Sequence, residues 1–159
     1  MSDAPARSGP PPLAPFGLVL HHDGRFIHEG EPIRHQKLRE HFDRSVEYLP
    51  GEGKFIVRLG HFRGQIEVEE AGFFVRSVDI ATGEIALSDG TRERLGVPSL
   101  SLSPIDGALM CRVKRVLVSE GLLARFMPAA QSELLLAVEE RDGRTVVRLG
   151  GGLVDFPDV

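Results

Sequence analysis

Residues 18–33, LVLHHDGRFIHEGEPI, contain two short apolar segments on either side of Asp23-Gly24. The Asp-Gly pair suits the positive φ values of a two-residue turn, so this stretch predicts a β-hairpin at the start of the fold. The predicted register places His21 opposite Phe26. It also puts His21 and His28 on the same face of the hairpin, because side chains alternate along a strand.

A helix is expected directly after this hairpin. Pro32 fits a first helical turn, where the N–H that proline lacks would have no partner. Apolar residues then recur at helical spacing from Ile33 to Leu49, and Pro50-Gly51 ends the pattern. Gly30, just before this helix, leaves backbone N–H groups free to face a ligand. Helix N-termini attract anions through such groups and through the helix dipole.

This predicted helix start is a candidate site for a small anionic ligand. Arg34 and His35 in the first turn would assist binding, and Arg25 and His28 precede it in the hairpin. Alternatively, Glu29 and Glu31 cap this helix end themselves, in which case no anionic ligand is needed there.

The rest of the chain reads mainly as strands separated by turn signals. Strands are expected over residues 54–59, 64–69, 73–80, 84–88, 109–118 and 144–149, and a second helix over 128–140 beginning at Pro128. A two-residue loop at Gly60-His61 would place Arg58 opposite Arg63. Charge repulsion therefore favours a four-residue loop. The fold class predicted is α+β, with mostly antiparallel strands and two helices.

Length and composition fit one domain. The chain has 159 residues, of which 42% are hydrophobic and 26% charged. Residues 1–16 hold five prolines and predict a disordered leader, and residues 17–159 predict a single compact domain. Asp-Gly-Arg recurs at 23–25 and 142–144, which suggests duplicated halves, 17–80 and 81–159. Chance recurrence of a common turn dipeptide explains it equally well.

Charge and hydropathy exclude some classes of function. The net charge is −4 and the pI about 5.9, so nucleic-acid binding is disfavoured. Residues 18–159 lack an apolar run of membrane-spanning length, which predicts no membrane partner. Cys111 is the single cysteine and suits a reducing cytoplasm, where we expect the protein to be located. Oligomeric state leaves no signal in the sequence.

The histidines raise a second kind of chemistry. All six lie between residues 21 and 61, yet none has the spacing of a known metal motif. No cofactor is therefore predicted, and His21 and His28 are only weak metal candidates. A hydrolase using His21, His28 and Glu29, with or without a metal, is one alternative function. Glu67 and Glu69 lie on one strand face and would suit acid–base chemistry, although wet strand faces commonly carry such residues.

Several segments resemble a bacterial family, domain of unknown function 1285 (DUF1285). They are residues 23–33 (DGRFIHEGEPI), 65–71 (QIEVEEA), 123–126 (LARF) and two glycine-containing turns near the end. The resemblance spans about residues 21–156. This chain departs from the family pattern at Phe26, Glu70 and Gly72, where the family commonly has Trp, Asp and Pro.

The resemblance implies an α+β fold with repeated strand–helix motifs, no assigned enzymatic activity, and a role in signal transduction or ligand sensing. The motif positions in this sequence are Arg25, His28, Glu29, Gly30, Glu67, Glu69 and Arg125. The function predicted is therefore a non-enzymatic sensing module that binds a small polar or anionic ligand. A protein-interaction module whose proline-rich leader docks a partner is a further alternative.

Overall fold

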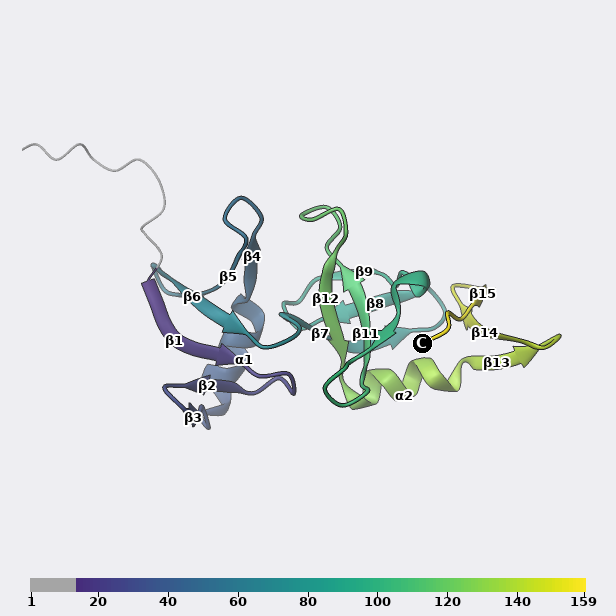
Figure 1. Cartoon of the computed structure of the whole chain (residues 1–159), viewed down its shortest axis with the longest axis horizontal. Helices are drawn as coiled ribbons and strands as arrows, with labels where there is room; N and C mark the ends of the chain where they lie inside the picture. The colour runs from purple at the N-terminus through teal and green to yellow at the C-terminus, as the bar shows by residue number, and fades with distance from the viewer. Residues whose placement is uncertain (1–13) are drawn as a thin grey trace, which may run out of the picture.

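The computed structural model describes residues 14–159, and its first six strands form one sheet on which helix α1 (Gln36–Ser45) packs (Figure 1). These strands are β1 (Ala14–Leu20), β2 (Phe26–His28), β3 (Glu31–Pro32), β4 (Glu47–Leu49), β5 (Lys54–Leu59) and β6 (Phe62–Val68). Their order across the sheet is β3-β2-β1-β6-β5-β4. The central neighbours β1 and β6 are parallel, and the other pairs are antiparallel.

The next six strands form a second sheet beside the first. They are β7 (Phe73–Asp79), β8 (Glu84–Leu87), β9 (Arg92–Arg94), β10 (Ser101–Leu102), β11 (Leu109–Val113) and β12 (Leu122–Phe126). Their order is β10-β11-β12-β7-β8-β9, and again the first and last strands are the parallel pair at the centre. In each sheet the chain therefore starts at the centre and runs outward through the next two strands to one edge. It then crosses to the opposite edge and returns strand by strand to the centre. The crossing is α1 in the first sheet and a 3-10 turn, Val97–Ser99, in the second.

Helix α2 (Pro128–Leu136) follows the second sheet and leads to a three-stranded antiparallel sheet at the end of the chain (Figure 1). Its strands are β13 (Val138–Arg141), β14 (Arg144–Leu149) and β15 (Gly152–Asp155). The α+β class, the two helices and the mostly antiparallel pairing predicted from the sequence are confirmed. Within residues 14–159, neither helix is long and apolar enough to cross a membrane.

The internal repeat is real, but its units differ from the predicted halves 17–80 and 81–159. The repeated topologies span 14–68 and 73–126. Asp-Gly-Arg at 142–144 lies at the β13–β14 turn of the C-terminal sheet, outside both repeats, so it is not the counterpart of the copy at 23–25. Most of the predicted leader, residues 1–13, lies outside the described residues. Its last three residues belong to β1.

The first hairpin has a longer loop than the sequence predicted. Leu20 pairs with Phe26, and the amide of His21 donates to Arg25 O over 2.8 Å, so the pairing of His21 with Phe26 is wrong. The cause is the Asp23 side chain, whose carboxylate accepts from the Arg25 amide over 3.0 Å. Such side-chain turns compete with a two-residue hairpin turn. A two-residue turn with both φ values positive instead occurs at Glu29-Gly30.

The predicted helix start at Pro32 is also wrong. Pro32 lies in β3, an edge strand, which tolerates the missing donor. Helix α1 begins at Gln36 after His35, and it ends at Ser45 because the following residues pair with β5 as strand β4.

The β5–β6 loop has two residues, and Arg58 does lie opposite Arg63. The expected four-residue loop is wrong for two reasons. Gly60, with φ of 60°, suits the first position of a type II′ turn. The Arg58 guanidinium also pairs with Glu47 on the opposite side, in β4, which offsets the repulsion. A strand pair considered alone misses this third strand.

Two elements are shorter than expected in the second half. Strand β11 ends at Val113, because Lys114 adopts a φ of 57° and a turn follows. Helix α2 begins at Pro128 as predicted but ends at Leu136, where the chain enters β13.

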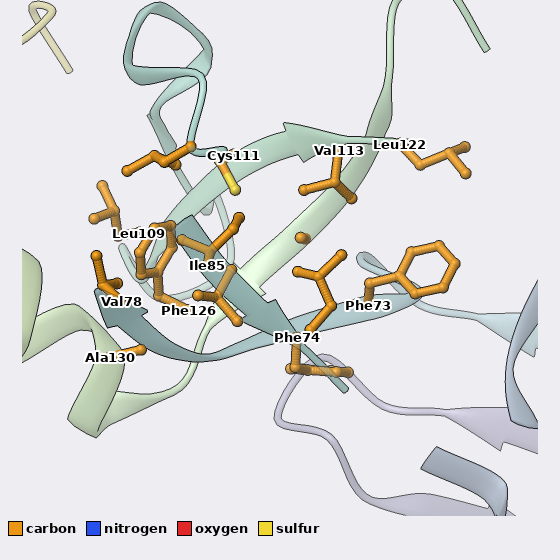
Figure 2. Packing of buried hydrophobic residues seen from close by; sticks show 14 of the residues in the cluster. Phe73, Phe74, Val78, Ile85, Leu109, Cys111, Val113, Leu122, Phe126 and Ala130 are labelled. Atoms are coloured by element: carbon orange, nitrogen blue, oxygen red, sulfur yellow. The ribbon is translucent and has the colours of Figure 1, made fainter. Parts of the chain in front are cut away.

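One continuous apolar core includes residues of all three sheets. Figure 2 shows its central part, where Phe73 and Phe74 of β7 extend from the second sheet toward the first. The Phe73 ring lies 6.1 Å from the Phe55 ring of β5, and the Phe74 ring packs against Gly24 in the β1–β2 loop. Gly72, just before β7, lets Phe55 approach the backbone there.

Gly72→Ala should destabilise the fold, because the new Cβ would lie 2.3 Å from the Phe55 ring. Overpacking of this kind costs about 1–3 kcal/mol. Chemical denaturation of the variant and of Gly152→Ala, where the Cβ meets nothing within 4 Å, gives the comparison. Equal stability of the two variants would contradict the packing described.

Cys111 should be inert in the folded protein. It is completely buried, and burial raises the pKa of its thiol to about 12. Since the thiolate is the reactive form, a thiol-specific chromogenic reagent at pH 8 should label the chain only after denaturation. Rapid labelling of the native protein would show that β11 opens readily.

Candidate functional site

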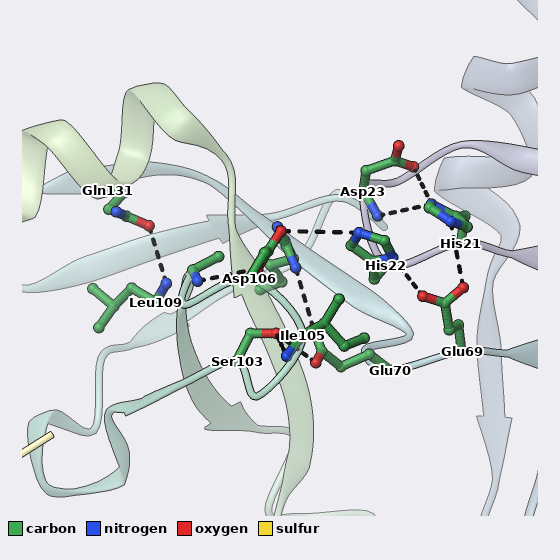
Figure 3. Close-up of polar contacts among 12 residues, drawn as sticks. His21, His22, Asp23, Glu69, Glu70, Ser103, Ile105, Asp106, Leu109 and Gln131 are labelled. Carbon is green, nitrogen blue, oxygen red and sulfur yellow. Dashed lines mark hydrogen bonds and ion pairs between the residues drawn. The ribbon is translucent and has the colours of Figure 1, made fainter.

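The polar residues that gather in this fold lie at the junction of the two large sheets (Figure 3). Strands β1 and β6 are parallel neighbours, so their carboxyl ends leave the first sheet at the same edge. The Glu69 amide continues the ladder by donating to Leu20 O over 3.0 Å. This bond places Glu69 beside His21 and His22, which immediately follow β1.

A histidine–carboxylate cluster results. His22 Nδ1 contacts Glu69 Oε1, and His21 Nε2 lies 3.4 Å from Glu69 Oε2. The outer nitrogens also face carboxylates. His21 Nδ1 lies 2.8 Å from Asp23 Oδ1, and His22 Nε2 lies 3.9 Å from Asp106 Oδ2. One nitrogen from each ring and one Glu69 oxygen lie within 4.8 Å of one another, close enough to share a metal ion.

Arg125 of β12 holds the other half of the junction. It donates to Glu70 Oε1 over 3.2 Å and also pairs with Asp106. The second Glu70 oxygen accepts from the Ser103 hydroxyl over 2.6 Å. The side chains of Arg125 and Glu70 are only 11% and 7% exposed, so this is a nearly buried pair that joins the end of β6 to the second sheet.

These contacts set the charge states at the junction. The hydrogen bond from Arg125 lowers the pKa of Asp106, helped by the Ala108 amide. Burial alone would lower the pKa of Arg125, but its bonds to Asp106 and Glu70 raise it overall. Both groups therefore stay ionised at neutral pH. The pair also places Asp106 beside His22, in a loop that otherwise has little regular structure.

Two adjoining cavities open at this junction, and together we call them the inter-sheet groove. One, of about 460 Å³, lies between the β10–β11 loop, Arg125 and the start of α2. The other, of about 300 Å³, lies between α1 and β7. Both are lined by Asp23, Phe74 and Met127, so they share a wall and an apolar surface.

Arginines of three elements line the second cavity of the groove. They are Arg25 in the β1–β2 loop, Arg39 on α1 and Arg76 on β7. Arg76 pairs with Asp43 over 2.8 Å, and Arg25 with Asp23 over 2.8 Å. Burial raises the pKa of Asp43 despite the nearby Arg76 and Arg39.

The structure brings together only some of the residues singled out in the sequence. Arg25, Glu69 and Arg125 lie at the junction. Glu67 is exposed on β6 and lies outside the cluster. Asp23 and Asp106, by contrast, are central to it.

His28 does not join His21. It pairs with Leu18 at the other end of the β1–β2 ladder and lines an apolar cavity of about 320 Å³ beside α1. Glu29 and Gly30 form the β2–β3 turn, with Glu29 near Gly17. The proposed catalytic group of His21, His28 and Glu29 is therefore not assembled.

The expected anion site at the start of α1 is also not assembled. The helix begins at Gln36, and His35 Nδ1 itself accepts the Leu38 amide over 3.3 Å. Arg34 precedes this cap and is exposed. Gly30 and Pro32, on which the site depended, lie in the β2–β3 hairpin instead.

The sequence reading missed His22, Asp106, Arg39 and Arg76. The adjacent pair His21-His22 could have indicated the site. Side chains alternate between faces only within a strand, so two adjacent histidines can both face one site once the strand has ended. Asp106 lies in the β10–β11 loop, which no sequence pattern connects to β1. Arg39 and Arg76 approach each other only through packing of α1 near β7.

Arg125→Met should cost about 3 kcal/mol of unfolding free energy, because it leaves the nearly buried Glu70 carboxylate without its cation. Adding Glu70→Gln should recover more than half of this loss, since the amide oxygen still accepts from Ser103. The exposed Arg141→Met is the control, with a change within about 0.5 kcal/mol. Urea denaturation that gives additive single and double effects would exclude the buried pair.

No protein-family model matches the sequence, and no curated protein is significantly similar to it. Two solved structures are similar in fold. One is a DUF1285 family protein from Silicibacter pomeroyi DSS-3, with a TM-score of 0.63 and 19% identity, covering 98% of this chain and 89% of that one. The other is a DUF1285 family protein from Shewanella baltica OS155, with a TM-score of 0.48 and 14% identity, covering 72% of this chain and 85% of that one.

The fold of the Silicibacter protein extends over almost the whole of this chain, including both large sheets. The resemblance suggested by the hairpin motif, the acidic strand and the Leu-Ala-Arg-Phe segment is thus confirmed in three dimensions. This chain has the fold of a DUF1285 family protein.

Proposed function

We propose that this protein is a non-enzymatic ligand-sensing module that binds a small anionic compound in the inter-sheet groove. The observation that carries the proposal is the convergence of Arg25, Arg39 and Arg76 on one cavity from three separate elements. Guanidinium groups bind carboxylates and phosphates with paired hydrogen bonds, so they are well suited to such a ligand.

Arg39 is the best candidate for a direct contact. Arg25 and Arg76 each have a carboxylate partner within the protein. Among residues 14–159, the Arg39 side chain makes no hydrogen bond, although it lies near enough to Asp43 to affect that group's pKa. Its donors therefore stay free for a ligand. Phe74 and Met127 supply an apolar surface for the rest of the molecule.

The position of the groove supports a sensing role. A ligand held there contacts α1 of the first repeat and β7 of the second at the same time. It would bind best to one relative placement of the two sheets, and preferential binding shifts a population toward that placement. A signal-transduction module needs this coupling between occupancy and shape.

Thermal denaturation of the full chain with a panel of inorganic phosphate, di- and tricarboxylates and nucleotides tests the proposal. A compound present at a hundred times its Kd should raise the Tm by about 5–10 °C. Arg39→Ala should weaken that compound about tenfold or more, because a charged hydrogen bond is lost.

Arg92→Ala is the matched control, since Arg92 is an exposed arginine on β9 outside the groove. It should bind as the wild type does. A panel that leaves the Tm unchanged, or a ligand held equally well by Arg39→Ala, would remove the groove as the binding site.

A further inference from the structure

The histidine–carboxylate cluster brings together side chains that are common ligands of metal ions. All four ring nitrogens of His21 and His22 face carboxylate oxygens, from Glu69 on the inner side and from Asp23 and Asp106 on the outer side. His21 Nδ1 lies 2.8 Å from Asp23 Oδ1 and also accepts from the Asp23 amide over 3.5 Å. His22 Nε2 lies 3.9 Å from Asp106, beyond hydrogen-bond distance. On the inner side, one nitrogen of each ring and a Glu69 oxygen converge closely enough to share a cation.

The two rings also lie close to each other. Their centroids are 4.0 Å apart, and neither side chain is fully exposed to water. A cation on the inner side would be bound by one nitrogen of each ring and by a Glu69 oxygen. The outer nitrogens would keep their places beside Asp23 and Asp106.

We propose that His21, His22 and Glu69 bind one divalent transition-metal ion, with zinc the best match. Zinc takes imidazole nitrogen and carboxylate oxygen as ligands, and a set of three protein ligands leaves a further position for water or another small ligand. Magnesium and calcium prefer sites made of oxygen alone. This site differs from the arginine-lined cavity and does not depend on it.

The surroundings of the rings match those of metal-binding histidines. Such histidines usually donate their outer N–H to a carboxylate, which fixes the ring orientation. Asp23 Oδ1 lies in this place, 2.8 Å from His21 Nδ1, and Asp106 Oδ2 lies on the outer side of His22 at the longer distance of 3.9 Å. Each is held in turn by an arginine, Arg25 for Asp23 and Arg125 for Asp106. The backbone is also fixed, because the His21 and Glu69 amides both donate to ordered carbonyls.

The test uses Zn²⁺ alone, titrated into chelator-treated full-length protein in competition with a chromogenic zinc indicator. We expect one tight site per chain. His22→Ala and Glu69→Gln should each weaken it by about 100-fold or more, since removing an outer partner alone costs about 10–100-fold. Asp23→Ala should fall within that smaller range. Co²⁺ bound by the wild type should show the intense visible bands of a low-coordinate site, absent from His22→Ala.

His61→Ala and His28→Ala are the matched controls, because both histidines are exposed and lie outside the cluster. They should bind Zn²⁺ as the wild type does. Wild-type affinity no tighter than that of His22→Ala overturns the proposal. So does a wild-type Co²⁺ spectrum identical to that of the free aqueous ion, which tests the site without any variant.

The metal site and the ligand groove can fail separately. Arg39→Ala should retain full Zn²⁺ affinity, because Arg39 makes no contact with the histidine cluster. Loss of Zn²⁺ binding in Arg39→Ala would show that the ion lies in the groove instead, and would overturn the assignment to His21, His22 and Glu69.

Discussion

The parallel pairing of β1 with β6 is the constraint on which the rest of this structure depends. It joins the first and last strands of the first repeat at the centre of the sheet. It therefore brings the residues after Leu20 and those after Val68 to one place, although 48 positions separate them along the chain. The second repeat is built in the same way around β7 and β12. The junction receives polar residues from the ends of the first central pair, and Arg125 from β12 of the second.

The nearly buried Arg125–Glu70 pair fixes how the repeats meet at that junction. Glu70 belongs to the short segment between the repeats, and Arg125 to the last strand of the second. An ion pair shielded from water holds its two elements together, because separating the partners would leave a buried charge without its counter-charge. The same guanidinium holds Asp106 beside His22. One arginine thus orders both the sheet contact and the polar cluster.

The sequence predicted the elements better than their connections. Strands β5 to β8 and the start of α2 at Pro128 could be read from alternation and from helix-start chemistry. Two turns were predicted wrongly, for different reasons. At the first hairpin, Asp23 lies in the predicted turn itself, and its side chain accepts from the Arg25 amide instead of leaving a two-residue turn. At the β5–β6 loop, Glu47 on a third strand made the Arg58–Arg63 opposition tolerable. The local pattern cannot contain the second kind of information, because the deciding partner belongs to another strand.

The same limit explains why the sequence predicted only part of the candidate site. The most specific motif, residues 23–33, mainly specifies turns: Glu29-Gly30 forms a positive-φ hairpin turn and Pro32 an edge strand. This motif contributes to the candidate site through Arg25 and through the β1–β2 loop residues that precede Arg25. Glu69 and Arg125 could be selected from the sequence, but what they contact could not. Asp106 and Arg76 reach the junction only through tertiary packing.

The repeat topology has a consequence for how this protein reaches its native state. Within each repeat, neighbouring strands along the chain pair through short turns, whereas the central parallel pair closes the longest loop. Loop-closure entropy opposes that step most, so the outer hairpins can form well before the centre is joined. The junction cluster therefore comes into existence only when the slowest contact is made. Until then, each repeat presents the unpaired edges of its two central strands, and such an edge can pair with a strand of another molecule.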